Sequence, residues 1–593
     1  MQKVSQKWKD NQNELLAPES YVEISWTLTD PDAYEDASAD DDGVIYISNT
    51  EQIVSEVDKE IIPYATLEQN LWVLDGSRVI IPTSNYGDCG YISDDICDKN
   101  GKFTTAPVVT INFTHAHLNL IPGVTIIWGQ AYNEYAVDFK VTAYNGNTIV
   151  ATKDVIGNAD VRSVVDMDVV NYDRITISIS KWSLPHRRAR IAEFLPGAIK
   201  TYSKTELFSF EHSQEVDPIS ASLPKSEISF SIDNSNNEYN PNNLDSMAKY
   251  LVERQEVKAR YGYKVDGEAE WIDCGTFYMS EWDAPQSGMT ATFKARDLLE
   301  FMTGTYYRGL YSPNGVSLYD LAVDVLQDAD LPLEDDGATK WVVDESLKGI
   351  YTIAPLPVDT HANCLQLIAN AGGCVIYQDR KGMLHIEPFI QVETDYVINH
   401  FNSYSKSDIA LSKPLRQVGV SCYSYSVASE TTELYKGTMS ITGTKELLIN
   451  YSGAAANVVA TVSGGTLDSA TYYTNACLLS ITATGNVTIT VRGNSIESSS
   501  VVVVTDSGVA GETISVDNPL ITSQERAISV GEWVEAYMKN RMVLSSDWRA
   551  DPRLDALDVV DNENDYNTNK VIMTSVKYTY NGAFKGSGEG RVV

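Results

Sequence analysis

Short runs of alternating apolar and polar residues constrain the fold of this chain more than any other feature. The run YVEISWTL at residues 21–28 is the clearest example. Its two alternating sets are Tyr21, Glu23, Ser25 and Thr27 against Val22, Ile24, Trp26 and Leu28. A period of two sends successive side chains to opposite faces of a strand, so one face of this strand is expected to be buried. Similar runs rich in Val, Ile, Thr and Tyr recur along the chain, whereas helical periodicity is rare. This pattern predicts a mainly β protein.

Size and charge narrow the class of protein further. The length of 593 residues predicts a multidomain chain, with roughly three to five domains. It carries 81 acidic and 45 basic residues, a net charge of −36. A surface so acidic repels phosphate backbones, which argues against sequence-specific nucleic-acid binding. The charge suits either a soluble component of a particle or the wall of a channel through which DNA passes.

The chain is expected to be made and folded in a cytoplasm. No run approaches the ~20 apolar residues of a membrane span, and the first residues, MQKVSQKWKDNQNELL, lack the apolar core of a secretion signal. The seven cysteines are scattered and form no CxxC pair, which favours free, buried thiols. A disulfide between Cys89 and Cys97 is the less favoured alternative.

Residues 76–197 are predicted to form a β-sandwich, preceded by a β segment at residues 1–75. The strands are expected at 108–113, 124–129, 135–150 and 172–182. Asn145-Gly146 supplies the positive φ of a tight hairpin, and Pro196-Gly197 marks the end of the domain. In LWVLDGS (71–77), VDFKVTAYNG (137–146) and ITISISKW (175–182) this region resembles the galactose-binding-like jelly rolls of carbohydrate-binding modules.

The jelly-roll resemblance implies either an adaptor or a glycan-binding domain. Aromatic rings present flat apolar faces to a ligand, and Trp128, Tyr132 and Trp182 are the candidate stacking residues. Packing inside the domain explains the same three residues equally well.

Metal binding is not predicted from the sequence. His115 and His117 lie two apart on a strand, so both point to one face and can hold a metal ion. No carboxylate or cysteine is spaced in the sequence to complete that site. The acidic run DPDAYEDASADDD (30–42) is expected to be a solvated loop, and its spacing matches no calcium loop. At 233–238 the sixth position is Glu238 rather than glycine, which favours an Asx turn.

No catalytic signature is present in the sequence. It contains no GxSxG, HExxH or GxxxxGK[ST] motif, and no GxGxxG that opens a helix. Arg549, Asp551, Arg553 and Asp555 alternate in charge and predict a polar turn or a contact between subunits. We therefore expect no catalytic residue, no cofactor and no enzymatic activity.

Helical patterns are confined to a few places. Ser317 is predicted to cap a helix whose buried stripe is Leu318, Leu321, Ala322, Val325 and Leu326. A second helix starts at Asp359 or Thr360 and stops at Gly372-Gly373, before a hairpin turned at 379–382. A short helix is expected at 244–253. A further helix is capped by Ser523, with Ala527, Val530, Val534, Tyr537 and Met538 on its buried face.

Between these helices and strands the chain resembles phage minor structural proteins of the tail-hub type. The resemblance rests on SEISFSIDNSNNEYNPNN (226–243), ERQEVKARYGY (253–263), GTFYMSEW (275–282), FKARDLLEFM (293–302) and DWRADPRLDALD (547–558). It covers about 198–430 and 515–593. It implies a first hub β-barrel at 198–305, a small α/β insert at 306–400 and a second barrel at 401–593. The Ser-, Thr- and Val-rich residues 431–514 are expected to form an inserted β-sandwich, in which SSVVVVT (499–505) must be paired.

The resemblance implies a structural role in the tail of a virion. A hub of this kind forms a homotrimeric ring at the tail tip or baseplate and touches the tube or distal tail protein, the tape measure and the fibres. DNA passes through its lumen during ejection, and the protein is made in the cytoplasm of the host bacterium. The alternative is an adhesin that binds a host surface glycan through the jelly roll.

Overall fold

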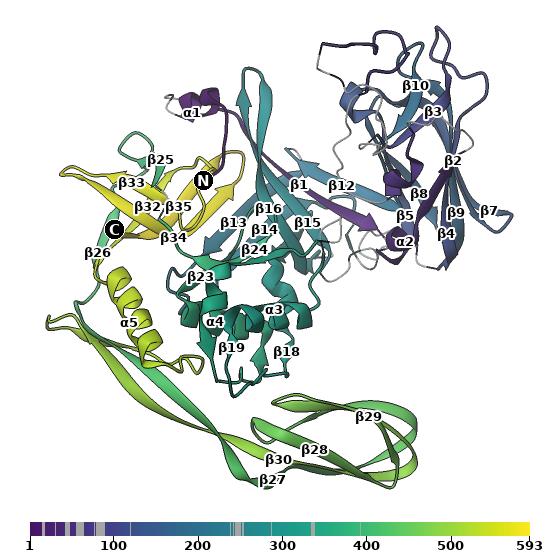
Figure 1. Ribbon diagram of the computed structural model, residues 1–593. Coiled ribbons are helices and arrows are strands. Elements are labelled where there is room, and N and C mark those ends of the chain that lie inside the picture. Colours follow the sequence, from purple (N-terminus) through teal and green to yellow (C-terminus); the bar gives the residue numbers. More distant parts are fainter. Residues whose placement is uncertain are drawn as a thin grey trace.

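The computed structural model shows a mainly β, multidomain chain with a body, an upper lobe and a long arm (Figure 1). It describes the whole chain except residues 13, 15–17, 30, 42–47, 55–63, 76–77, 79–88, 119, 205, 238, 241, 243–250, 252–253, 286–287, 334–337 and 392. The helix expected at 244–253 falls almost entirely outside the described residues. Within the described part, no helix is both long enough and apolar enough to cross a membrane.

The body is built on one 13-stranded sheet. Its first half contains β1 (Ser20–Thr29), β12 (Gly197–Ser203), β13 (Leu207–Glu215), β14 (Lys225–Asp233), β15 (Glu256–Val265), β16 (Glu268–Asp283) and β17 (Thr290–Arg296). The second half contains β25 (Glu393–Ile398), β26 (Asp408–Leu411), β32 (Met542–Arg549), β33 (Val559–Glu563), β34 (Thr568–Tyr580) and β35 (Phe584–Val592). The main strand order is β12-β1-β15-β16-β17-β14-β13-β34-β35-β32-β26, and β33 joins β25 to β34.

A seam between β13 and β34 joins the two halves that the sequence predicts as separate barrels. The two strands pair antiparallel from Phe210–Tyr580 to Glu215–Ser575. One apolar core runs beneath both halves and includes Phe230 and Tyr261 from the first and Trp548 and Tyr578 from the second. The halves therefore share a sheet and a core.

Strand β1 confirms the alternation seen in the sequence. Val22 and Ile24 are fully buried and Trp26 is 1% exposed, and all three belong to the shared core. Because β1 pairs with both β12 and β15, the start of the chain is part of the first half of the body.

The upper lobe contains the predicted sandwich strands. A five-stranded sheet, in the order β2-β4-β9-β6-β7, faces a three-stranded sheet, β11-β5-β8, and a pair, β10-β3. The strands are β2 (Ser38–Asp41), β3 (Tyr91–Ile96), β4 (Val108–His117), β5 (Ile121–Ile127), β6 (Ala136–Asn145), β7 (Thr148–Ile156), β8 (Arg162–Val169), β9 (Tyr172–Trp182), β10 (Arg188–Ile191) and β11 (Glu193–Leu195). Gly146, at φ +57°, makes the predicted hairpin turn between β6 and β7.

The acidic run at 30–42 is wrongly predicted as a solvated loop. Residues Pro31–Asp36 form the short helix α2, and β2 follows and pairs with β4. Ala33 and Ala39 of this run are buried in the core of the lobe. These small apolar residues attach the run to the lobe despite its charge.

The insert packs two helices on a small sheet. It contains η4 (Leu298–Thr303), β18 (Thr305–Tyr306), β19 (Val316–Ser317), α3 (Leu318–Asp328), β20 (Trp341–Val343), η5 (Glu345–Gly349), β21 (Tyr351–Thr352), β22 (Asp359–Thr360), α4 (His361–Gly372), β23 (Cys374–Gln378) and β24 (Leu384–Pro388). Ser317 and Thr360 cap α3 and α4, Gly373 ends α4 in the left-handed conformation, and β23 pairs with β24. The predicted stripe on α3 is buried.

The arm is a two-stranded ribbon with a curled tip. It contains β27 (Leu415–Asn450), β28 (Ala455–Ser463), β29 (Thr466–Tyr472), β30 (Ala476–Asp506) and β31 (Glu512–Val516), all hydrogen-bonded in one five-stranded sheet. The expected separate sandwich at 431–514 is corrected accordingly, because β27 and β30 continue from the tip to the body. The prediction that SSVVVVT is paired is confirmed, since Val501 to Thr505 pair with 418–422 of β27.

The arm is attached at both ends. At its base, α5 (Gln524–Met538), capped by Ser523 as predicted, packs with β27 against the core of the insert. At its tip, the Thr474 amide donates to the Arg308 carbonyl at 2.9 Å. The Asn475 side chain donates to the Leu356 carbonyl at 2.8 Å. Figure 1 shows the ribbon passing beneath the insert between these two attachments.

Candidate functional site

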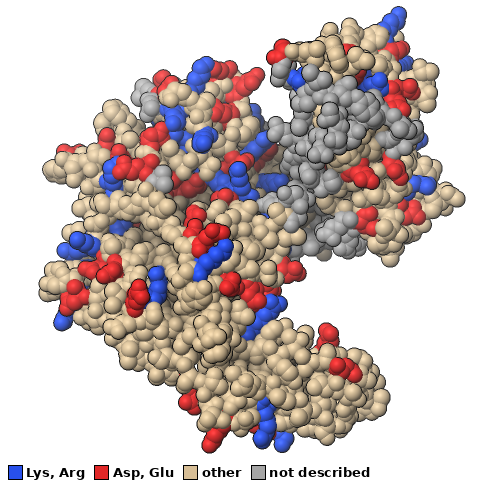
Figure 2. All heavy atoms as spheres, in the orientation of Figure 1, with Lys and Arg blue, Asp and Glu red and all other residues tan. Residues whose placement is uncertain are grey.

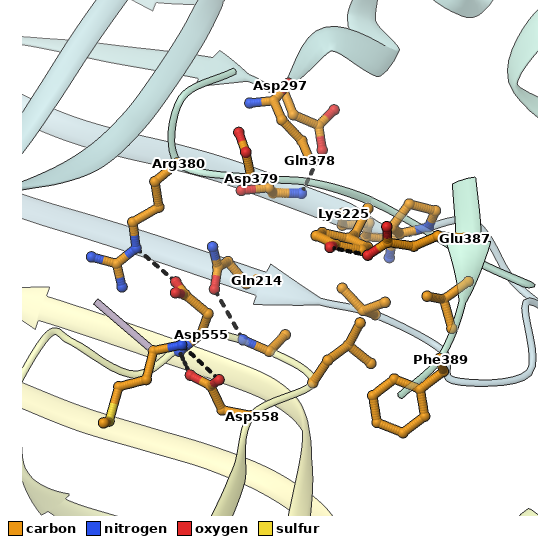
Figure 3. Close-up of a pocket in the computed structure, with 18 of the residues that line it drawn as sticks. Gln214, Lys225, Asp297, Gln378, Asp379, Arg380, Glu387, Phe389, Asp555 and Asp558 are labelled. Carbon is orange, nitrogen blue, oxygen red and sulfur yellow. Dashed lines mark hydrogen bonds and ion pairs between the residues drawn. The ribbon is translucent and has the colours of Figure 1, made fainter. Parts of the chain in front are cut away.

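Arg380 connects the insert to both halves of the body. It lies in the turn between β23 and β24, and its side chain is 3% exposed. Its guanidinium donates to the Asp273 carbonyl in the first half at 2.8 Å. In the second half it donates to Asp555 and to the Pro552 carbonyl, each at 2.7 Å. Figure 3 shows Arg380 reaching from the turn to Asp555 on the facing loop.

The charged run at 549–555 makes contacts within the chain. Asp551 accepts hydrogen bonds from the Trp8 indole at 3.0 Å and from Arg553 at 2.6 Å, and both acid and base are almost fully buried. Arg549 donates to the Glu14 carbonyl at 2.9 Å. Arg549 ends β32 and the rest of the run lies in the loop and turns that follow, whereas a contact between subunits stays a prediction. The run binds the N-terminal segment and α1 (Gln6–Gln12) to the body.

A cavity of about 680 Å³ opens beside this junction. The lining residues labelled in Figure 3 are Gln214, Lys225, Asp297, Gln378, Asp379, Arg380, Glu387, Phe389, Asp555 and Asp558. Burial raises the pKa of Asp297 to about 7, despite hydrogen bonds from the Leu299 and Ser226 amides. The bond from Leu299 caps η4 and the bond from Ser226 holds the start of β14, so Asp297 stabilises the local structure. The absence of enzymatic activity stays a prediction.

A buried polar group lies under the sheet close to Arg380. His212 on β13 is 1% exposed, and its Nδ1 lies 2.7 Å from the Tyr261 hydroxyl and 3.4 Å from the Cys274 sulfur. Burial, together with the positive charge of Arg380, lowers the pKa of His212 to about 3. The imidazole is therefore neutral in the folded protein at neutral pH.

Two of the three candidate glycan-stacking residues lie in the core of the lobe. Trp128 is 0% and Trp182 1% exposed, and their rings meet edge to face. Their indole nitrogens donate to Ser163 and Glu134, each at 2.8 Å. Tyr132 is half-buried against the guanidinium groups of Arg78 and Arg190. Trp128 and Trp182 therefore offer no face to a sugar, because both complete the packing and polar bonding of the lobe.

His115 and His117 do share one face, as predicted, and a carboxylate joins them. The ring centroids are 4.4 Å apart. Asp36 Oδ2, at the end of α2, lies 2.9 Å from His117 Nε2 and 3.4 Å from His115 Nδ1. Sequence spacing could not reveal Asp36, because 79 residues separate it from His115 and no local pattern marks the contact.

The base of the arm exposes a row of valines. On β30, Val501 is 66%, Val502 64% and Val504 50% exposed. Over 497–506, β30 pairs with β27 along one edge, and no described strand pairs with its other edge. Figure 2 shows that the arm carries few charged side chains on the visible face compared with the body and lobe.

All seven cysteines lie among the described residues and are buried, and none of them, Cys89 and Cys97 included, forms a disulfide. This confirms the prediction of buried thiols and excludes the alternative clip. Burial raises the pKa of Cys274 and Cys364 to about 12, which keeps both thiols protonated.

Comparisons with known proteins return distant structural likenesses only. The 43 kDa tail protein of prophage MuSo2 from Shewanella oneidensis matches with 12% identity, 66% of this chain and 95% of that chain covered, and a TM-score of 0.34. A tail protein from Neisseria meningitidis matches with 9% identity, 66% and 93% covered, and a TM-score of 0.35. Prophage tail protein gp18 from Listeria monocytogenes matches with 7% identity, 66% and 91% covered, and a TM-score of 0.34. No family model and no curated protein matches the chain.

Proposed function

We propose that this protein is a structural component of a bacteriophage tail tip or baseplate hub. Copies would form a ring at the distal end of the tail tube and connect it to the parts that adsorb to the host. The proposal is supported by the tail-hub resemblance of residues 198–430 and 515–593 and by the architecture of the body. In this role the protein works through its shape and its contacts.

The β13–β34 seam is the observation that carries this proposal. The pairing from Phe210–Tyr580 to Glu215–Ser575 makes the two halves one rigid unit with a common core. Arg380 then fixes the insert to both halves. A ring of such units would present two β modules per copy, which suits a trimer that docks on a sixfold tube. The net charge of −36 suits a lumen wall that does not retain passing DNA.

The exposed valines on β30 supply a surface for self-association. An unpaired strand edge with β-branched apolar side chains favours contact with another chain. Val501, Val502 and Val504 form such an edge next to α5, which packs on β27 and β30. We place one contact between copies on this edge.

The oligomeric state tests the proposal. Light scattering after size exclusion is expected to give the mass of a trimer for the purified full-length chain. Replacing Val502 and Val504 by lysine should shift the distribution toward monomer, since charges on the edge oppose strand pairing. Val459→Lys is the control, because Val459 is also exposed, at 58%, but lies on β28 at the tip.

One result would count against the ring itself, and a second only against placing the contact between copies on the valine edge. A chain that remains monomeric at every concentration, and in assembled particles, would remove the ring. If the valine substitutions leave the trimer intact, the ring stands, but the contact between copies lies on another surface.

A further inference from the structure

The cluster of Asp36, His115 and His117 has the composition of a metal site. Its three ligand atoms, one from each side chain, all lie within 4.8 Å of one another. Around a zinc ion with bonds of about 2.0 Å, tetrahedral ligand atoms lie about 3.3 Å apart. The distance of 3.4 Å between Asp36 Oδ2 and His115 Nδ1 matches this spacing, and the 2.9 Å between Asp36 Oδ2 and His117 Nε2 has only to lengthen slightly.

We propose that Asp36, His115 and His117 bind one divalent transition-metal ion, with zinc as the best fit. Two imidazole nitrogens and one carboxylate oxygen are borderline ligands that suit zinc better than calcium or magnesium, which prefer oxygen only. Three protein ligands leave a fourth position for water. The ion lies between α2 and the end of β4, at the edge of the upper lobe.

Local packing holds the ligands in position. His117 has a side chain only 3% exposed, and its ring contacts Phe113 and Tyr172. The register of β4 against β9 shifts between Asn112 and His117, and this irregularity is where both histidines turn toward Asp36. His115 is 65% exposed, which leaves a path for an ion from solvent.

A second layer of hydrogen bonds orients the carboxylate. The Thr114 hydroxyl donates to Asp36 Oδ1 at 2.5 Å, and the Thr114 amide donates to Asp36 Oδ2 at 2.8 Å. Outer partners of this kind fix the direction of a metal-binding carboxylate. Although burial acts to raise it, these bonds and the nearby histidines lower the pKa of Asp36. The carboxylate is therefore ionised and ready to bind at neutral pH.

The ion would fasten the acidic run to the sandwich. Asp36 follows α2 directly, and β2 then pairs with β4. A metal bond between Asp36 and two residues of β4 closes a loop of about eighty residues, a constraint that stabilises the folded lobe. The competing account is a hydrogen-bonded His–Asp pair without an ion, and the experiment separates the two.

Metal binding to the full-length chain is the direct test. The chain must be untagged, because a polyhistidine tag binds zinc, and it is dialysed with excess zinc and then against metal-free buffer. Elemental analysis is expected to find one zinc per chain, and cobalt in its place should give the strong visible absorption of a tetrahedral site. The thermal midpoint of the lobe should rise with zinc.

Variants locate the ion. Asp36→Asn and His115→Ala should each weaken zinc binding at least tenfold and remove the cobalt spectrum. His115 is exposed, so His115→Ala is expected to fold even if a variant of buried His117 does not. His400→Ala is the control at an exposed histidine outside the cluster. His385→Ala tests a histidine outside the cluster that has two carboxylates within 4.0 Å, Asp379 and Glu387.

The outcomes are decisive in either direction. Loss of zinc in Asp36→Asn and His115→Ala, with binding retained in His400→Ala and His385→Ala, supports the site. Absence of bound zinc in the unmodified chain, or zinc that survives both cluster variants, overturns it.

Discussion

Arg380 bonds to both halves of the body from its position in the insert. Its partners are carbonyls and a carboxylate, and it is almost fully buried. Removing one partner of a buried ion pair leaves the other charge without compensation, which costs far more than the pair contributes when intact. Its position therefore makes Arg380 a structural centre of the molecule.

Arg380→Met is expected to destabilise the body by about 3–5 kcal/mol, because Asp555 loses its cation and several carbonyls lose a donor. The measurement is the thermal unfolding midpoint of the body by differential scanning calorimetry. Arg296→Met is the control, since that guanidinium is half-exposed and its ion pairs lie at the surface. Equal midpoints for Arg380→Met and the unmodified chain would contradict this account.

His212 gives the body an acid-sensitive point. With a pKa of about 3 in the folded protein and about 6.5 when unfolded, only the unfolded chain takes up the proton between these values. Stability is therefore complete above pH 6.5 and is lost as the pH falls toward 3, by about 2 kcal/mol at pH 5. His212→Gln should remove this part of the acid sensitivity.

The measurement is the urea midpoint at pH 7 and pH 5 for the unmodified chain and His212→Gln, with His400→Gln as the exposed control. Asp297, with a pKa raised to about 7, acts in the opposite direction, because its stability contribution is lost as the pH rises toward 7. The difference between variants isolates His212 from that opposing effect. An identical acid response in all three chains would show that His212 is not the sensitive group.

At the scale of elements, capping residues predict where the helices begin and end. Ser317, Thr360 and Ser523 accept hydrogen bonds from the third residue after each of them, and Gly373 ends α4. The alternation in β1 predicts which face is buried. Each of these signals lies within a few residues of sequence, so it can be found without knowing the fold.

Contacts between distant elements are not predictable in this way. The many acidic residues at 30–42 predict a solvated loop, yet Ala33 and Ala39 pack into the core of the lobe. The sequence is equally compatible with Trp128 and Trp182 as binding residues or as core residues. Their burial in the structure shows that they belong to the core. Asp36 joins His115 and His117 through folding alone.

The arm behaves as an element with its own core. Leu434, Ile441, Leu479 and Ile489 belong to a cluster at the tip that is separate from the core around α5. Residues 428–495 can therefore be replaced by Asn-Gly, which closes a tight turn between Val427 and Ile496, a directly paired position.

This deletion is expected to leave the thermal midpoint of the body within a few degrees of the full chain, because α5 and its partner residues on β27 stay in place. Differential scanning calorimetry and limited proteolysis provide the measurements. A shorter deletion, of 451–475, which removes β28 and β29 at the tip, is the comparison. A body that no longer unfolds cooperatively would show that the tip contacts at Arg308 and Leu356 support the insert.

At the scale of the whole molecule, the sequence predicts the order of the modules but not how they join. A mainly β, multidomain chain is confirmed. The β13–β34 seam could not be predicted, because β-branched alternation marks a strand without naming its partner. The one-sheet body and the continuous arm follow from such long-range pairings.

The seam also affects how the chain folds while it is being synthesised. Its partners Glu215 and Ser575 are 360 residues apart, and ribosomes add about 5–20 residues per second. The edge of β13 thus waits roughly 20–70 seconds for its neighbour while the rest of the polypeptide is still being synthesised. Throughout that interval the nascent chain carries an open edge, so its yield should depend on chaperones and on slow expression at low temperature more than on the stability of the finished protein.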